Sequence, residues 1–192
     1  EIPLRLVGSE MCIRDRYTTQ QPADGWQNAG FNDKAWKEGE AAFGTMENEH
    51  TAKTQWGEEF IWVRRVADIQ EDLTGKNVYL EFSHDDDAII YINGIKVVDT
   101  GNACKKNERV KLSEEVVASL KPGENLIAGY CHNRVGNGLL DFGLLVELDG
   151  YRSFHQTAQQ TSVDVQPMQT YYNFTCGPVD LNLTFTAPLF MD

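Results

Sequence analysis

The segment Ala88–Val98 reads AIIYINGIKVV, and this stretch decides the fold class. Apolar and β-branched residues lie on both sides of the dipeptide Asn93-Gly94, which tolerates the positive φ angles that a tight two-residue turn requires. We therefore predict a hairpin in which Ile89–Ile92 pairs with Ile95–Val98. Because a lone hairpin is only marginally stable in water, we expect further strands elsewhere in the sequence.

Further strand patterns flank this hairpin. Val78–Ser83 reads VYLEFS and places Val78, Leu80 and Phe82 on one face. The other candidate strands are Ile61–Val66, Arg109–Leu112, Asn125–Cys131 and Phe142–Leu148. Short strands at this spacing predict an all-β fold, a β-sandwich of two antiparallel sheets over residues 17–150.

One short helix interrupts the strands. Ser113 is a suitable N-cap, and Glu114 and Glu115 follow it at the positive end of the helix. The helix should end at Leu120, because Lys121-Pro122-Gly123 cannot continue it.

The chain has 192 residues, of which 41% are hydrophobic and 24% charged, so it should hold one globular domain and part of another. Residues 151–161 are polar and lack an apolar period, which predicts a linker. Strand-like runs follow within residues 162–192, ending with Val179–Thr186. They predict the truncated start of a second β-domain, too short to bury a core alone.

The start of the chain has an unusual composition. Residues 6–16 read LVGSEMCIRDR and resemble a translated sequencing adapter. We therefore interpret residues 1–16 as a non-native scar and exclude them from the expected fold.

The net charge of −12 disfavours two classes of partner. A strongly acidic surface repels nucleic-acid phosphates and anionic lipid headgroups, so we expect no nucleic-acid partner. No apolar run reaches the ~18–20 residues of a membrane span, so we expect no membrane insertion. The first 30 residues also lack a signal-peptide pattern.

The cysteines give no metal or catalytic pattern. Outside the excluded segment they are Cys104, Cys131 and Cys176, without a CxxC spacing, so at most one intrachain disulfide can form. Cys131 precedes His132, but neighbours on a strand face opposite ways and cannot form a dyad. We therefore expect no catalytic residue and no cofactor.

The acidic cluster HDDD at residues 84–87 has two interpretations. Carboxylates near Asp85 and Asp87 could contribute to a structural Ca²⁺ site, which needs about six to eight oxygen ligands. We favour the alternative, in which the run shapes a turn between strands and pairs with Arg64 or Arg65. One of these arginines should face inward, where it needs a carboxylate partner.

The tryptophans also have two interpretations. The aromatic residues among the glycines of residues 25–44 should form a loop-rich wrap that closes one end of the sandwich. Core or loop anchoring is the general expectation for Trp, whereas an exposed indole could stack on a sugar ring. Trp56 is the best exposed candidate, and Asp86 and Asn133 are the candidate partners for sugar hydroxyls.

Two resemblances extend this interpretation. The series Gly25-Trp26, Gly30–Asp33, Trp36-Lys37, Phe43-Gly44, Trp62–Arg65, His84–Ala88 and Tyr91–Gly94 resembles the galactose-binding-like jelly-roll module of many secreted bacterial carbohydrate-active enzymes. Tyr172–Leu181 and Phe185–Leu189 resemble the first strands of the β-sandwich domain in the bacterial glutaminase A family. The helical portion taken to hold the hydrolytic centre in that family has no counterpart here, so no catalytic residue is carried over.

The resemblances imply a function for the intact parent rather than for this chain. They imply the non-catalytic N-terminal accessory region of an exported bacterial hydrolase that converts glutamine to glutamate and ammonia. Its partners would be the C-terminal catalytic domains of the same chain, in the periplasm or outside the cell. The alternatives are a carbohydrate-binding module of a glycoside hydrolase and a purely structural spacer domain.

Overall fold

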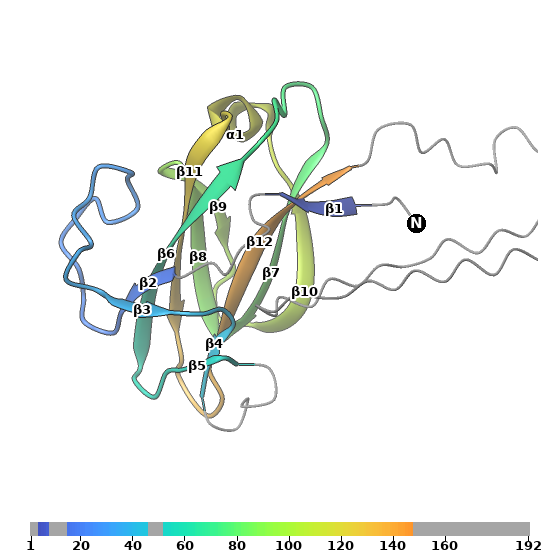
Figure 1. Ribbon diagram of the computed structural model, residues 1–192. Helices are drawn as coiled ribbons and strands as arrows, with labels where there is room; N and C mark the ends of the chain where they lie inside the picture. Colours follow the sequence, from blue (N-terminus) through green and yellow to red (C-terminus); the bar gives the residue numbers. More distant parts are fainter. Residues whose placement is uncertain (1–3, 8–14, 46–51, 148–192) are drawn as a thin grey trace, which may run out of the picture.

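The computed structural model describes residues 4–7, 15–45 and 52–147, and Figure 1 shows two sheets packed face to face. The predicted linker at 151–161, the predicted second β-domain at 162–192 and Cys176 lie outside the described residues. In the part of the chain described here, no helix is long and apolar enough to be a membrane span.

Sheet A has the strand order β10-β7-β12-β4-β5, with β1 also paired to β12. Its strands are β1 (Leu4–Val7), β4 (Phe43–Gly44), β5 (Thr54–Gln55), β7 (Val78–Asp85), β10 (Cys104–Lys111) and β12 (Leu139–Glu147). All pairs in sheet A are antiparallel except β4 with β5.

Sheet B has the order β3-β2-β6-β11-β8-β9 and is antiparallel throughout. Its strands are β2 (Asp15–Thr18), β3 (Lys37–Gly39), β6 (Phe60–Ile69), β8 (Asp87–Ile92), β9 (Ile95–Asp99) and β11 (Gly123–His132). The predicted all-β sandwich is therefore confirmed.

The predicted hairpin is present as β8 and β9. Ile92 pairs with Ile95, and Asn93 and Gly94 have φ angles of 48° and 85°. The Asn93 side chain also accepts a hydrogen bond from the Leu126 amide at 2.9 Å, which ties the turn to β11. The turn thus fixes the local register and joins the hairpin to the sheet.

The predicted helix is also confirmed. α1 covers Glu114–Ser119, and the Ser113 hydroxyl accepts a hydrogen bond from the Val116 amide at 3.3 Å. Leu112 and Leu120 on either side of the helix are buried, so the helix is anchored at both ends by the core.

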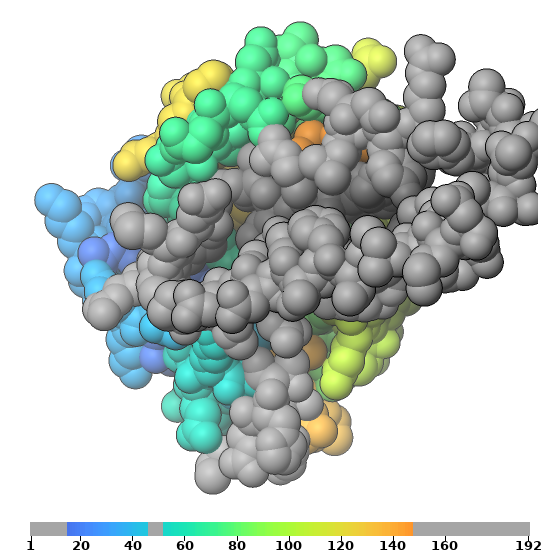
Figure 2. Space-filling model, turned by 45° about the vertical axis from the view of Figure 1, so that its right-hand side comes forward, coloured from blue at the N-terminus to red at the C-terminus, as the bar shows by residue number. Residues whose placement is uncertain are grey.

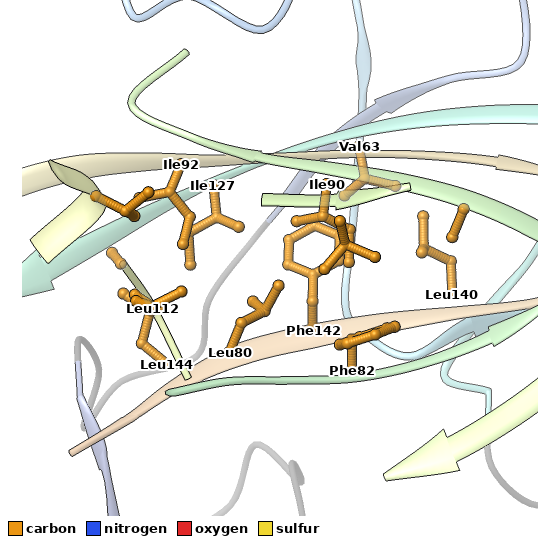
Figure 3. Packing of buried hydrophobic residues seen from close by; sticks show 14 of the residues in the cluster. Val63, Leu80, Phe82, Ile90, Ile92, Leu112, Ile127, Leu140, Phe142 and Leu144 are labelled. Carbon is orange, nitrogen blue, oxygen red and sulfur yellow. The ribbon is translucent and has the colours of Figure 1, made fainter. Parts of the chain in front are cut away.

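The hydrophobic core lies between the two sheets (Figure 3). Val78, Leu80 and Phe82 share the inner face of β7, as their alternation predicts, and each is at most 2% exposed. Gly129 on β11 faces Phe142, and a Cβ atom there would lie 2.4 Å from the Phe142 ring. The absence of a side chain at residue 129 therefore lets this ring fill the space between the sheets.

Residues 1–16 do not lie wholly outside the fold, so their exclusion requires correction. β1 pairs with β12 through Leu6 and Leu145, and β2 begins at Asp15. The Asp15 side chain is fully buried and accepts two hydrogen bonds from Arg65, at 2.9 and 2.7 Å. The interpretation as a scar is not supported, because the structure uses this carboxylate to pair a buried cation.

The aromatic wrap lies in a different place from the one predicted. Residues 19–36 lie on the outer face of sheet B, beside β2 and β6 in Figure 1. The Trp26 ring contacts Tyr91 edge to face, with centroids 5.7 Å apart. The prediction that these aromatics close one end of the sandwich is therefore wrong for residues 25–36, because Arg64 holds that loop on the sheet face instead. Phe43, from the same predicted wrap, is buried in the core as part of β4.

Candidate functional site

Three segments meet at one end of the sandwich. They are the crossing from β7 to β8, the β11–β12 connection at residues 133–138, and residues 56–59 before β6. Figure 2 shows the orange β11–β12 region and the cyan β5–β6 region at the same lower end of the molecule. This end contains all three sequence-predicted sugar-binding residues, Trp56, Asp86 and Asn133.

The acidic cluster forms the crossing between the two sheets. β7 of sheet A ends at Asp85 and β8 of sheet B begins at Asp87, so Asp86 is the single residue between these two strands. The Asp86 carboxylate accepts hydrogen bonds from the Arg134 and Val135 amides, at 2.7 and 3.3 Å. The predicted turn is confirmed, and Asp86 holds the neighbouring loop in place.

The ion-pair partner of the cluster is not the predicted one. The Arg134 Nε atom lies 2.6 Å from the Asp87 Oδ2 atom. Arg64 instead pairs with Asp33 at 2.6 Å, and Arg65 pairs with Asp15. The prediction of pairing with Arg64 or Arg65 is therefore wrong. Each guanidinium pairs with a carboxylate from outside the cluster.

The prediction that one arginine faces inward is confirmed. Arg65 is 3% exposed and lies over the Phe142 ring, with Asp141 at 3.5 Å as a second carboxylate. Burial alone would lower the pKa of Arg65, but attraction from Asp15 and Asp141 raises that pKa above its ordinary value. The guanidinium is therefore charged at every accessible pH.

The described residues contain no group of three or more His, Cys, Asp or Glu side chains arranged to hold a metal ion. Burial raises the pKa of Asp85 and the neighbouring Asp86 raises it further, whereas a hydrogen bond with Cys104 lowers it. Asp87 is already paired with Arg134. The candidate Ca²⁺ site at Asp85 and Asp87 therefore has no support in this geometry.

Trp56 is 2% exposed, so the expectation of an exposed indole is wrong. The ring packs against Gly138, where a Cβ atom would lie 2.8 Å from the Trp56 ring and 3.1 Å from the Asn133 amide nitrogen. Asn133 donates from this nitrogen to the Gly136 carbonyl at 3.1 Å and closes the loop. The structure thus brings Trp56, Asp86 and Asn133 to one end of the sandwich. The contacts described for these side chains are with the β11–β12 connection, which they hold in place.

This end of the molecule has unused hydrogen-bonding capacity. Four buried side-chain atoms lack a partner within the described structure, and all four lie here: Trp56 Nε1, His84 Nε2, Asp87 Oδ1 and Asn133 Oδ1. Buried polar atoms are normally satisfied, so a cluster of exceptions marks a place that suits a polar ligand. We therefore treat this end as the candidate site.

Beside this end, four rings lie next to one another on the outer face of sheet B. We call Phe60, Trp62, Tyr130 and His132 the aromatic strip. The Phe60 and His132 rings are stacked with centroids 4.5 Å apart, and the Trp62 and Tyr130 centroids are 5.3 Å apart. Phe60 links the two pairs, with its centroid 5.9 Å from that of Trp62.

A chain of ionisable side chains borders the aromatic strip. Glu59 lies 3.0 Å from His132 Nε2, and Asp87 lies 3.3 Å from His132 Nδ1. Asp87 then reaches Arg134 at 2.6 Å. The border therefore alternates acidic and basic side chains and offers both acceptors and donors.

The thiols offer no nucleophile at this site. Both described cysteines, Cys104 and Cys131, are free. Burial raises the pKa of Cys131 to about 12, so its thiol stays protonated at neutral pH. Cys131 faces the core whereas His132 lies on the outer face, which confirms that the two cannot form a dyad.

Phe60, Tyr130 and His132 were not among the binding residues predicted from the sequence. The available signal is the alternation in β6 and β11, where these residues lie opposite the core-facing Ile61 and Cys131. The alternation divides each strand into two faces but does not say which face is solvated. That requires knowing how the strands pair and which side packs against the other sheet.

Comparison with known proteins gives a fold likeness. No family model matches this chain, and no curated protein matches it. The structure is similar to a Bacteroides uniformis β-glucuronidase 2, with a TM-score of 0.55 and 16% identity over 76% of this chain and 18% of that one. It is also similar to a β-glucuronidase from glycoside hydrolase family 2, with a TM-score of 0.51 and 19% identity over 74% and 17% of the two chains.

A second Bacteroides uniformis β-glucuronidase structure gives a TM-score of 0.52 and 16% identity, over 76% of this chain and 18% of that chain. The chain thus spans less than a fifth of the length of these solved structures. At these identities the likeness establishes the β-sandwich fold and leaves function to the chemistry of the site.

Proposed function

We propose that this chain is a non-catalytic accessory β-sandwich module of a multidomain glycoside hydrolase. The observation that carries the proposal is the fold likeness that covers 76% of this chain but only 18% of a β-glucuronidase. A chain of 192 residues would then be one part of a much larger enzyme. Its partners would be the other domains of the same polypeptide.

The chemistry of the candidate site supports a binding role rather than a catalytic one. The buried Cys131 thiol is protonated at neutral pH, and His132 lies on the opposite face of β11. Asp87 and Glu59 are both held by His132, and Asp87 also by Arg134. These contacts fix the positions of both carboxylates at the border of the site.

The glutaminase interpretation has weaker support. It rests on residues 172–189, which lie outside the described residues, and no comparison supports it. The alternative, a module of a glycoside hydrolase, is favoured because the structural neighbours are β-glucuronidases. Export to the periplasm or the cell exterior remains part of the proposal, as the jelly-roll resemblance implies.

Two assays test this proposal. The purified chain should not hydrolyse aryl β-glucuronides, aryl β-galactosides or glutamine above a buffer control. The source gene, cloned with its flanking sequence, should encode a protein that hydrolyses an aryl β-glycoside but not glutamine. Turnover by the chain alone, lost on a point substitution, would show that the module is catalytic. Glutamine hydrolysis by the longer protein would restore the glutaminase interpretation.

A further inference from the structure

We propose that the aromatic strip on the outer face of sheet B binds the apolar face of a pyranose ring in an oligosaccharide. The class of ligand rests on the proposed function, whereas the position of the surface rests on the structure. This position differs from the expected site, because Trp56 is buried, whereas Phe60, Tyr130 and His132 on the sheet face are half-buried.

The composition of this face is the first argument. The solvated face of an antiparallel sheet normally alternates polar residues with the buried ones. Here Phe60 and Trp62 are consecutive outward positions on β6, and Tyr130 and His132 are the residues that pair with them on β11. The four rings therefore form a two-by-two array instead of a polar surface, with Phe60 and His132 stacked and Trp62 tilted by 46° from Tyr130. Trp62 is only 8% exposed, so it supports the array from below.

The wrap of residues 19–36 is the second argument. It covers the neighbouring part of the same face, where Trp26 contacts Tyr91 and Arg64 binds the Asn28 carbonyl. Phe60, Tyr130 and His132 remain partly exposed. The fold thus covers one part of the outer face with its own loop and leaves three rings of the adjacent aromatic part partly accessible.

The charged border is the third argument. The outer members of the chain are accessible, with Glu59 63% and Arg134 50% exposed, whereas His132 and Asp87 are 17% and 13% exposed. The inner pair fixes the outer pair, so an acceptor and a donor are held beside the rings before any ligand arrives. Such preorganisation lowers the entropic cost of binding.

This combination suits a sugar better than a protein. A pyranose ring presents apolar C–H groups on its faces and hydroxyls around its edge, which match partly exposed aromatic rings with a mixed polar border. Stable protein interfaces involve about 20–30 residues on each side and are depleted of charge at their centre. Three half-buried rings beside the exposed Glu59 and Arg134 form a small mixed surface, which is smaller and more charged than such an interface.

The test is a titration of the purified chain with cellotetraose, xylotetraose and mannotetraose, followed by amide chemical shifts. We expect saturable shifts at Phe60, Tyr130, His132 and Arg134 with at least one of these sugars. The dissociation constant should be about 0.1–1 mM, because few contacts are made and water competes for each.

Three variants make the titration specific. Phe60→Leu keeps an apolar side chain but removes the flat ring, and it should weaken binding about tenfold. Glu59→Gln should weaken binding about threefold through loss of a charged acceptor. Tyr79→Ala, on the outer face of β7 in sheet A, is the matched control and should leave binding unchanged. An unchanged thermal unfolding midpoint would exclude a general loss of fold for each variant.

Several outcomes would overturn the inference. These are no saturable shift with any of the sugars, shifts confined to other residues, or equal losses in Phe60→Leu and Tyr79→Ala. Shifts of the strip on addition of the remaining domains of the parent, with no response to sugars, would identify a contact between domains instead. The result is separable from the proposed function, because sugar binding is measured on this chain and glycosidase activity on the longer protein.

Discussion

The two faces of β6 hold neighbouring arginines in different ways. On the inner face, Arg65 is 3% exposed and lies between Asp15 and Asp141. On the outer face, Arg64 is 5% exposed because the loop of residues 19–36 covers it, and it pairs with Asp33. The two side chains are almost equally buried, but one is buried by the core and the other by a loop.

This difference determines what happens when each cation is lost. Asp15 has no access to water, so its charge would stay uncompensated in the core. Asp33 is 22% exposed and could be hydrated again if the loop moved away. Equal burial therefore does not imply equal energetic consequences, because the cost depends on whether the partner can reach water.

The largest expected loss of stability comes from removing the arginine on the inner face of β6. Arg65→Ala should lower the free energy of unfolding by about 3–5 kcal/mol, because it leaves a carboxylate buried without its cation. Urea unfolding monitored by tryptophan fluorescence measures this change. The double substitution Arg65→Met with Asp15→Leu should recover most of the loss. A cost for Arg65→Ala no greater than that for Arg64→Ala would contradict the comparison.

Removing the arginine on the outer face of β6 should cost less stability and should loosen only the loop that covers it. Arg64→Ala removes hydrogen bonds to Asp33 and to the Asn28 carbonyl and should cost about 1.5–3 kcal/mol. The released loop should then be cut by trypsin at Lys34 before the rest of the domain is degraded. Arg134→Ala, half exposed at the end of the sandwich, is the control and should cost less than about 1 kcal/mol. Cleavage at Lys34 at the same rate in both variants would argue against Arg64 as the anchor of the loop.

The parts of this fold that sequence reasoning predicted are those set by local chemistry. The Asn93-Gly94 turn, the alternation of Val78, Leu80 and Phe82, and the Ser113 cap each depend on residues within a few positions. The burial of charge at Asp15 depends on a partner 50 positions away, on a different strand. No pattern within a window of ten residues contains that information.

The candidate site was predicted only in part, because some of its features also depend on residues far apart in the sequence. The sequence placed Asp86 in a turn, and the structure confirms the turn. The burial of Trp56 depends on Gly138, which is far away in the sequence and has no side chain to occupy the space of the ring. The aromatic strip depends on the register of β6 against β11, which sets Trp62 opposite Tyr130.

The comparison of inner and outer faces can also be tested on β11, where Cys131 faces the core and His132 faces outward. Alkaline pH should destabilise the fold by favouring ionisation of the buried Cys131 thiol. Burial raises the pKa of Cys131 from 9.0 to about 12, so the folded state holds this proton more tightly than the unfolded state. The resulting stability is fully present below pH 9.0 and is lost as pH rises towards about 12. The slope should be at most about 1.4 kcal/mol per pH unit.

Unfolding of the native chain and of Cys131→Ala at pH 8, 9 and 10 would measure this contribution. The difference in free energy between the two proteins should move in favour of Cys131→Ala as pH rises, because the variant has no thiol to ionise. The difference at pH 8 gives the cost of the cavity and serves as the reference. A constant difference across this range would show that the thiol ionises equally in both states.

The last comparison makes the same substitution on each face of β6, and its outer member has the smallest expected effect. Val63 is fully buried on the inner face, whereas Val66 is 52% exposed on the outer face. Replacing valine by threonine keeps the shape and adds a hydroxyl, which costs roughly 1–3 kcal/mol when it is buried without a partner. Val63→Thr should therefore destabilise by about this amount, and Val66→Thr should stay within about 0.5 kcal/mol of the native chain. Because strand propensity and volume are nearly the same in the two variants, the difference between them isolates solvent access. Urea unfolding of both variants measures it, and equal losses would mean that the outer face at Val66 is covered in solution.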